Sequence, residues 1–316
     1  FPMSRLGDFN TAPRLKELVE TLTGGGKLSH RFENFAIHNI SKWILAGGYP
    51  KETMRIYGFP AENPLYVFML DQNDLEAPHL QVRTPSEGHD CSILLEGLKE
   101  IVSVALPSIK MHGKILLESD TYVRDTFIKL QQEGFPFMID MKCDCIPFYI
   151  NETQRRTIKD LSISAPQGFV INEIDVPSEF NKIHFAWAYA DTAPAENTRL
   201  RLSHLPSICI RDFDGNLAAW ELTNTFGQLT HLYTFEPYRG KGIGVITEVL
   251  LAQKIVREDL HVYKYVTLEN ESVVRGTLKH PLWSQWKLTE DGKERGEEKD
   301  VMWSFNHFKY TKVENN

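Results

Sequence analysis

Apolar residues in the second half of the chain recur with a spacing that changes repeatedly between the two-residue period of a strand and the helical period of 3.6. Two strand-like runs, 207–211 and 217–223, flank Asp214-Gly215. This dipeptide predicts a tight hairpin, because glycine adopts the positive φ that such turns need. The other expected elements of this half are strands at 168–174, 229–235 and 262–268 and helices at 177–189 and 243–256. Their order predicts an α/β fold built on a mixed sheet.

A similar alternation precedes residue 150 and predicts a second α/β unit. Its expected elements are helices at 12–22, 93–104 and 121–132 and strands at 65–70, 115–117 and 135–150. The polar stretch 151–160 is interpreted as a linker, and the stretch 191–197 as a loop. We therefore expect two domains, at 1–155 and 161–316, each long enough to bury its own core.

The segment 227–244 combines a strand, a glycine-rich turn and the start of a helix. Its turn has the sequence Arg239-Gly240-Lys241-Gly242-Ile243-Gly244. The first amides of a helix lack partners within the helix and lie at the positive end of the helix dipole, so they bind anions. Glycines let an anion approach the main chain closely. The segment therefore predicts a phosphate site.

The spacing of the glycines excludes the two commonest nucleotide motifs. A P-loop needs Ser or Thr directly after its Gly-Lys pair, whereas Gly242 follows Lys241. A dinucleotide fingerprint that starts at Gly240 needs a third glycine where this chain has Val245. The phosphate ligand is therefore of another kind.

The pattern Arg/Gln-x-x-Gly-x-Gly/Ala after a strand resembles the pyrophosphate loop of the GNAT superfamily of acyl-CoA-dependent N-acetyltransferases. Arg239, Gly242 and Gly244 occupy its three defining positions. The longer region is similar to the glycine N-acyltransferase family. The residues that carry this second likeness are Trp220, Gly227, Tyr238, Arg239, Asn270, Trp283 and Trp286. A packing turn in an unrelated α/β domain is the alternative interpretation.

The resemblance implies a GNAT acyl-CoA N-acyltransferase fold with two tandem GNAT-like domains, of which the C-terminal one is active. It implies acyl-CoA or acetyl-CoA as co-substrate, held by strands that diverge so that backbone groups pair with the pantetheine arm. For Leu232 and Thr234 the alternative interpretation is ordinary sheet pairing, and for Asn270 it is a helix cap. The expected cofactor-binding residues are Leu232, Thr234, Arg239, Gly240, Lys241, Gly242, Ile243, Gly244 and Asn270.

Acyl transfer needs a neutral amine, so a general base assists the reaction. In glycine N-acyltransferases this base is a glutamate directly after the glycine that matches Gly227, and here that position holds Gln228, whose amide takes up no proton at neutral pH. Three explanations stay open: His231 or Glu236 acts through water, the acceptor has a lower pKa, or acyl-CoA is bound without turnover. The candidate catalytic residues are Gln228 and His231, and strand alternation predicts that they point to opposite faces.

Composition narrows the remaining possibilities. The 316 residues carry a formal net charge of −7 with a pI near 5.9, which argues against a general nucleic-acid binder. No run of about 18 to 20 apolar residues predicts a membrane span, and the N-terminus shows no export signal. A cytoplasmic protein, or alternatively a mitochondrial one, is expected. The four cysteines and eleven histidines show no metal-ligand spacing, so we expect reduced thiols and no metal.

The function favoured by the sequence is transfer of an acyl group from CoA to a small amine, such as glycine or another amino acid. A non-catalytic acyl-CoA-binding protein and a protein or peptide N-acetyltransferase are the alternatives. Acyl-CoA and the amine are the expected partners, without nucleic acid or membrane. The oligomeric state stays open.

Overall fold

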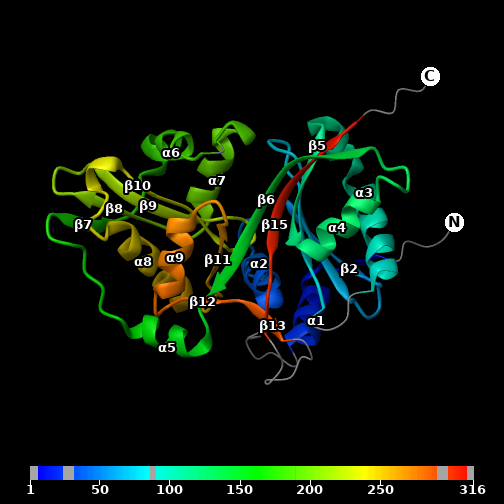
Figure 1. The fold of residues 1–316 in the computed structure, drawn as a ribbon, viewed down its shortest axis with the longest axis horizontal. Helices are drawn as coiled ribbons and strands as arrows, with labels where there is room; N and C mark the ends of the chain where they lie inside the picture. Colours follow the sequence, from blue (N-terminus) through cyan, green and yellow to red (C-terminus); the bar gives the residue numbers. More distant parts are fainter. Residues whose placement is uncertain (1–5, 24–31, 86–89, 189, 290–297, 312–316) are drawn as a thin grey trace.

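The computed structural model describes residues 6–23, 32–85, 90–188, 190–289 and 298–311. Within these ranges a mixed sheet of 13 strands runs through the whole molecule, with helices on both faces (Figure 1). The strand order is β1-β2-β3-β4-β5-β15-β6-β11-β10-β9-β8-β7, and β12 pairs beside β6. None of the described helices has the length and apolar character needed to cross a membrane.

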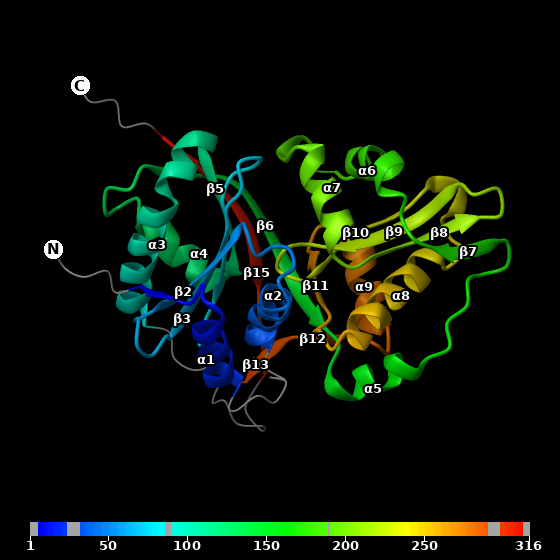
Figure 2. The ribbon, with the colours of Figure 1, turned by 180° about the vertical axis from the view of Figure 1, so that it is seen from behind.

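The N-terminal half of the sheet consists of an antiparallel group followed by one parallel pair. Its strands are β1 (Gly7–Asp8), β2 (Met54–Phe59), β3 (Tyr66–Asp71), β4 (His79–Arg83), β5 (Lys114–Asp120) and β6 (Phe137–Tyr149). Its helices are α1 (Ala12–Thr23), α2 (Phe35–Leu45), α3 (Cys91–His112) and α4 (Thr121–Lys129). Strands β1 to β4 are antiparallel neighbours, and β4 pairs parallel to β5. The helices α1 and α2 cover one face, and α3 and α4 cover the other (Figure 2).

The C-terminal half repeats this arrangement. Its strands are β7 (Phe169–Asn172), β8 (Ser207–Asp212), β9 (Leu217–Thr223), β10 (Leu229–Thr234), β11 (Tyr263–Thr267), β12 (Ser284–Gln285) and β15 (Trp303–Tyr310), with a separate hairpin of β13 (Lys287–Thr289) and β14 (Glu298–Asp300). Its helices are α5 (Glu152–Asp160), α6 (Val176–Phe185), α7 (Ala195–His204), α8 (Ile243–Arg257) and α9 (Glu271–Lys279). Strands β7 to β10 are antiparallel, and β10 is parallel to β11. The predicted mixed α/β sheet is confirmed.

The two halves exchange strands where they meet. The last strand, β15, lies between β5 and β6 and so completes the N-terminal half of the sheet. The long strand β6 continues past β15 to pair with β11 and β12, and its Phe148 is buried in the core beneath α8. In Figure 1 these two strands run side by side through the middle of the molecule. The boundary at 155–161 stays a prediction, and the strand pairing crosses it in both directions.

Two local expectations are wrong. The stretch 151–160, interpreted as a linker, contains the helix α5. A capping box starts this helix, because Gln154 N donates to Asn151 Oδ1 at 3.0 Å and Asn151 N donates to Gln154 Oε1 at 2.8 Å. Ile158 then packs in the core beneath α8. Similarly, α7 begins at Ala195, inside the segment expected to be a loop.

Candidate functional site

The glycine loop joins β10 to α8 and leaves the start of that helix open. Gly240 and Gly242 have φ values of +75° and +73°, and a side chain added at either position would meet nothing within 4 Å. No side chain caps α8, whose N-cap residue is Gly242. The first amides of the helix can therefore receive an external anion, with the helix dipole in its favour.

The other loop residues divide into two exposed cations and two packing positions. Arg239 donates from Nε to the Thr234 carbonyl at 2.9 Å, and the Lys241 ammonium lies 5.7 Å from the centre of the Tyr238 ring. Ile243 is buried in the core, so only its main chain can face a ligand. A side chain added at Gly244 would come within 3.1 Å of Thr234 Oγ1, which explains how closely α8 approaches β10. The loop thus combines two positive charges with open backbone.

Strands β10 and β11 separate soon after they meet. Their parallel pairing is recorded at one position, between Leu229 and Lys264. Leu232 and Thr234 lie beyond that position, on the part of β10 that diverges from β11, and Leu232 is 40% exposed. The strand divergence expected from the resemblance is therefore present, and its backbone edge can accept an extended ligand.

A β-bulge in β10 changes the direction of its side chains. The register with β9 shifts between Thr230 and Tyr233, and His231 has the left-handed φ of +57°. One extra residue interrupts the alternation of a strand. As a result Gln228 and His231 line the same cavity, and the expectation that they face opposite sides is wrong.

The His231 ring is held in a mainly apolar position. Its centre lies 4.2 Å from that of Trp187, and both ring nitrogens are buried without a hydrogen-bond partner among the described residues. Burial, with smaller contributions from the charges of Arg201 and His184, lowers the pKa of His231 to about 3. A histidine with so low a pKa is a poor proton acceptor near neutrality.

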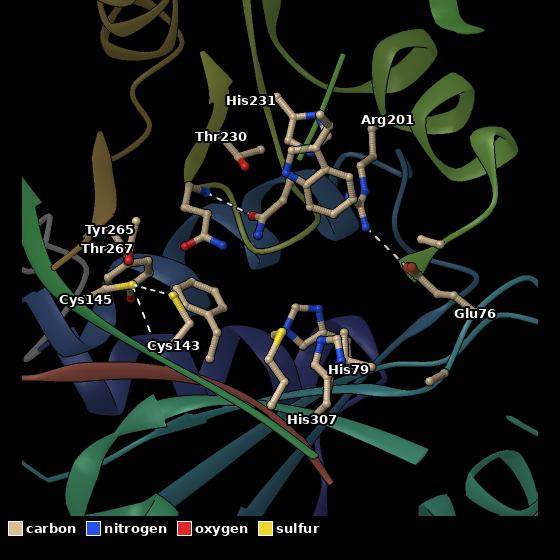
Figure 3. A pocket seen from close by; sticks show the side chains of 18 of the residues that line it. Glu76, His79, Cys143, Cys145, Arg201, Thr230, His231, Tyr265, Thr267 and His307 are labelled. Atoms are coloured by element: carbon tan, nitrogen blue, oxygen red, sulfur yellow. Dashed lines mark hydrogen bonds and ion pairs between the residues drawn. The ribbon is translucent and has the colours of Figure 1, made fainter. Parts of the chain in front are cut away.

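A cavity of about 250 Å³ opens where the two halves meet, at the start of β10 (Figure 3). Side chains from β4, β5, β6 and β15 form one wall, and α7, β10 and β11 provide the other. Arg201 and Glu76 face each other across one end of it, with 3.2 Å between Nη2 and Oε1. The cavity is thus shared between both halves of the chain.

A buried carboxylate lies behind the cavity wall. The Glu118 side chain, on β5, is 0% exposed. Gln81 Nε2 donates to Oε1 at 2.9 Å, and Gln228 Nε2 donates to Oε2 at 3.3 Å. His79 Nε2 also lies 3.3 Å from Oε2. Gln228 and His79 both line the cavity, so Glu118 joins two of its wall residues.

Two thiols of β6 lie in the same wall. Cys143 Sγ and Cys145 Sγ are 3.8 Å apart. The hydrogen bond with Cys145, assisted by Thr267, lowers the pKa of Cys143 to about 6. The pKa of Cys145 is raised by the same contact and by burial. In the part of the chain that the structure describes, no group of three His, Cys, Asp or Glu side chains could hold a metal ion.

Solved structures resemble this chain over nearly its whole length. A Drosophila protein superposes with a TM-score of 0.68 at 14% identity, over 96% of this chain and 98% of that one. A tandem GNAT protein from the clavulanic acid biosynthesis pathway superposes with a TM-score of 0.51 at 11% identity, over 95% of this chain and 98% of that one. A GCN5-related N-acetyltransferase from Kribbella flavida superposes with a TM-score of 0.50 at 13% identity, over 89% of this chain and 96% of that one. The chain has the GNAT fold. No protein-family model matches the sequence.

Within this GNAT fold the residues expected from the sequence lie in two groups. The glycine loop lies at one end of the diverging strand, and Gln228 and His231 lie in the cavity at the other. Asn270 caps α9, because its Oδ1 accepts from Val273 N at 3.4 Å. The helix cap is therefore present, and contact of Asn270 with a cofactor stays a prediction.

Sequence reasoning missed His79 and Glu118, which come from the N-terminal half of the GNAT fold. One signal was available for Glu118, since it directly follows the apolar strand run expected at 115–117. A carboxylate in a buried strand usually has a specific partner. Nothing local in the sequence connects it with Gln228, because 110 residues separate the two positions.

Proposed function

We propose that the chain is an acyl-CoA-dependent N-acyltransferase of the GNAT superfamily, related to the glycine N-acyltransferases, with a small amine as acceptor. The observation that carries the proposal is the continuity of the site. The diverging edge of β10 connects an open, positively charged helix start with a cavity between the two halves. From Thr230 to Thr234 the strand covers about 13 Å, at roughly 3.3 Å per residue.

The residues present fit a CoA thioester. The amides of 240–244 would hold its pyrophosphate, and the charges of Arg239 and Lys241 would assist them. The amide of Arg239 itself already donates to the Glu236 carbonyl at 3.1 Å. The backbone of Leu232 and Thr234 would pair with the pantetheine arm. When bound, the thioester supplies an activated acyl group. The chain's own contribution would be to orient the two reactants and exclude water, which can account for a large part of the acceleration.

A small acceptor fits the cavity better than a folded protein would. The volume of about 250 Å³ is below the usual range for drug-sized ligands, about 300–1,000 Å³. The Gln228 amide oxygen is buried and has no hydrogen-bond partner among the described residues. It can accept a hydrogen bond from the acceptor ammonium or amine. Arg201 in the cavity wall pairs with Glu76 through Nη2, and its other N–H groups suit an acceptor that carries a carboxylate, such as glycine or another amino acid.

Turnover tests this proposal directly. The protein would be mixed with acetyl-CoA and with longer and aromatic acyl-CoAs, each with and without glycine and other amino acids. Thiol release that depends on the amine, with the amide identified by mass, is the expected result. Binding of CoA esters without turnover would instead favour the non-catalytic binding protein. Turnover restricted to lysine-containing or N-terminal peptides would favour the protein acetyltransferase.

A further inference from the structure

We propose that His79, held in place by Glu118, is the general base of the acyl transfer, and this inference rests on the proposed function. The base would thus come from β4, in the half of the chain that does not carry the glycine loop. His79 lies in the wall of the cavity at the junction of the two halves, where the acceptor would bind (Figure 3).

The bases considered from the sequence do not fit the site. Gln228 takes up no proton at neutral pH. His231 keeps both ring nitrogens buried, and its pKa of about 3 makes it a weak acceptor. Glu236 is exposed beyond the far end of β10 and does not line the cavity. A different side chain of the cavity wall is needed to accept a proton.

The distance of 3.3 Å between Nε2 of His79 and Oε2 of Glu118 favours the tautomer in which the other nitrogen, Nδ1, accepts the proton. A carboxylate only accepts hydrogen bonds, so the ring nitrogen beside it, Nε2, carries hydrogen. The other nitrogen, Nδ1, makes no hydrogen bond within the described residues and keeps its lone pair. The His79 side chain is 15% exposed and lies in the cavity wall. This is the pairing of base and orienting carboxylate found in catalytic triads.

Gln228 links this pair to the acceptor. Its Nε2 donates to the same carboxylate oxygen that His79 contacts, Oε2 of Glu118. The opposite end of the amide, Oε1, is therefore left for a ligand, and it has no partner among the described residues. An ammonium group bound by this oxygen would lie next to His79. Gln228 is then a positioning residue at the place where the resembled family has its base.

The proton transfers balance as follows. Nδ1 of His79 takes one proton from the acceptor ammonium and later returns it to solvent. The neutral amine nitrogen forms a bond with the thioester carbonyl carbon, and the carbon–sulfur bond breaks. CoA leaves as the thiolate and takes the second proton that the nitrogen loses as it becomes an amide. One ammonium and one thioester thus give one amide, one thiol and one proton.

His307, the other histidine of this wall, is a weak proton acceptor. His307, on β15, also lines the cavity, and burial lowers its pKa to about 4, with smaller contributions from Lys114 and His79. The His79 ring lies nearly perpendicular to the ring of Phe226, with 4.8 Å between the ring centres. Glu118 is the carboxylate in direct contact with His79.

The test compares acceptors that do and do not need a base. The variant His79→Ala and the wild type would be assayed with a strongly basic amine and with hydroxylamine, which is already neutral at the assay pH. We expect a loss of about 100-fold or more with the basic amine and a much smaller loss with the neutral one. Added imidazole should restore part of the lost rate. The control His204→Gln removes an exposed histidine of α7 outside the cavity.

Folding is checked by thermal unfolding and by CoA affinity, and His79→Gln replaces the alanine variant if that one is unstable. An equal loss with both acceptors, without rescue by imidazole, would overturn the inference, because a purely structural role affects every acceptor. Unchanged turnover in the variant would also overturn it, while the proposed function would stand. Absence of turnover in the wild type with every amine would overturn the proposed function and this inference together.

Discussion

The substitution Gly242→Ala separates the ligand role of the glycine loop from its role in the fold. Gly242 has a φ of +73° and open space around the position of a side chain. Alanine therefore meets no clash, and its cost in the free protein is the left-handed backbone, about 1–2 kcal/mol. Gly215, in the β8–β9 hairpin, has a φ of +85° and equally open surroundings. Gly215→Ala should thus lose a similar amount of stability and serves as a matched control.

The two variants should differ in their response to CoA. A ligand at about 100 times its dissociation constant stabilises the native state by roughly 2.7 kcal/mol. A methyl group at Gly242 would keep a phosphate away from the adjacent amides. Loss of one hydrogen bond to a charged group costs about 1.5–3 kcal/mol, or roughly 10- to 100-fold in affinity. A 100-fold weaker complex at the same CoA concentration gains only about 0.4 kcal/mol.

Chemical unfolding with and without CoA measures both quantities in the same experiment. The expected result is a full CoA effect in Gly215→Ala and a largely lost effect in Gly242→Ala, at similar stability without ligand. If CoA stabilised the two variants equally, the open helix start would not be the phosphate site. If CoA failed to stabilise even the wild type, the loop would serve packing alone.

Three further predictions concern the cavity. Cys143, with a pKa of about 6, should react with iodoacetamide at pH 7 far faster than Cys209, because burial raises the pKa of Cys209 to about 12. Peptide mass spectrometry measures both rates, and equal rates would contradict this prediction. The pKa of His231 is about 3 in the folded protein and 6.5 as the reference for the unfolded chain. The unfolded chain therefore binds a proton first as the pH falls below 6.5, and the free energy of unfolding should decrease by about 2 kcal/mol at pH 5. In urea unfolding His231→Leu should lose less on acidification, and an unchanged loss would refute the assignment. Gln228→Glu should destabilise the protein by about 3–5 kcal/mol at neutral pH, because it places a second carboxylate beside Glu118. The loss of stability should be smaller in acid, and also smaller when Glu118→Gln is added. A Gln228→Glu variant as stable as the wild type at pH 7 would show that the two side chains are not in contact.

Local signals in the sequence predicted the elements that depend on few neighbours. Asp214-Gly215 specifies its hairpin through backbone conformation, and the apolar stripe of 243–256 specifies α8. The strand exchange of β6 and β15 has no such signal. It depends on pairing between segments that are more than 100 residues apart in the chain. The helix α5 was missed because it buries little apolar surface, and its capping box was not recognised.

The site was predicted well where it consists of main chain and poorly where side chains converge. Glycine spacing alone located the open helix start, since backbone conformation decides that feature. The direction of His231 was wrong, because a bulge adds a residue without any mark in the apolar pattern. The position of the proposed base, His79, depends on contacts across the junction of the two halves. Such contacts arise only when both halves have folded.

Gln228 and Glu118 have to be interpreted together. A glutamine at position 228 by itself suggests a lost base and an inactive protein. Beside a buried carboxylate, however, a glutamate there would bring two negative charges together in a place that water does not reach. The amide avoids that repulsion and donates a hydrogen bond instead. The glutamine at position 228 is therefore consistent with the proposal that Glu118, on β5, supplies the carboxylate and acts through His79. By itself it does not argue for a loss of catalysis.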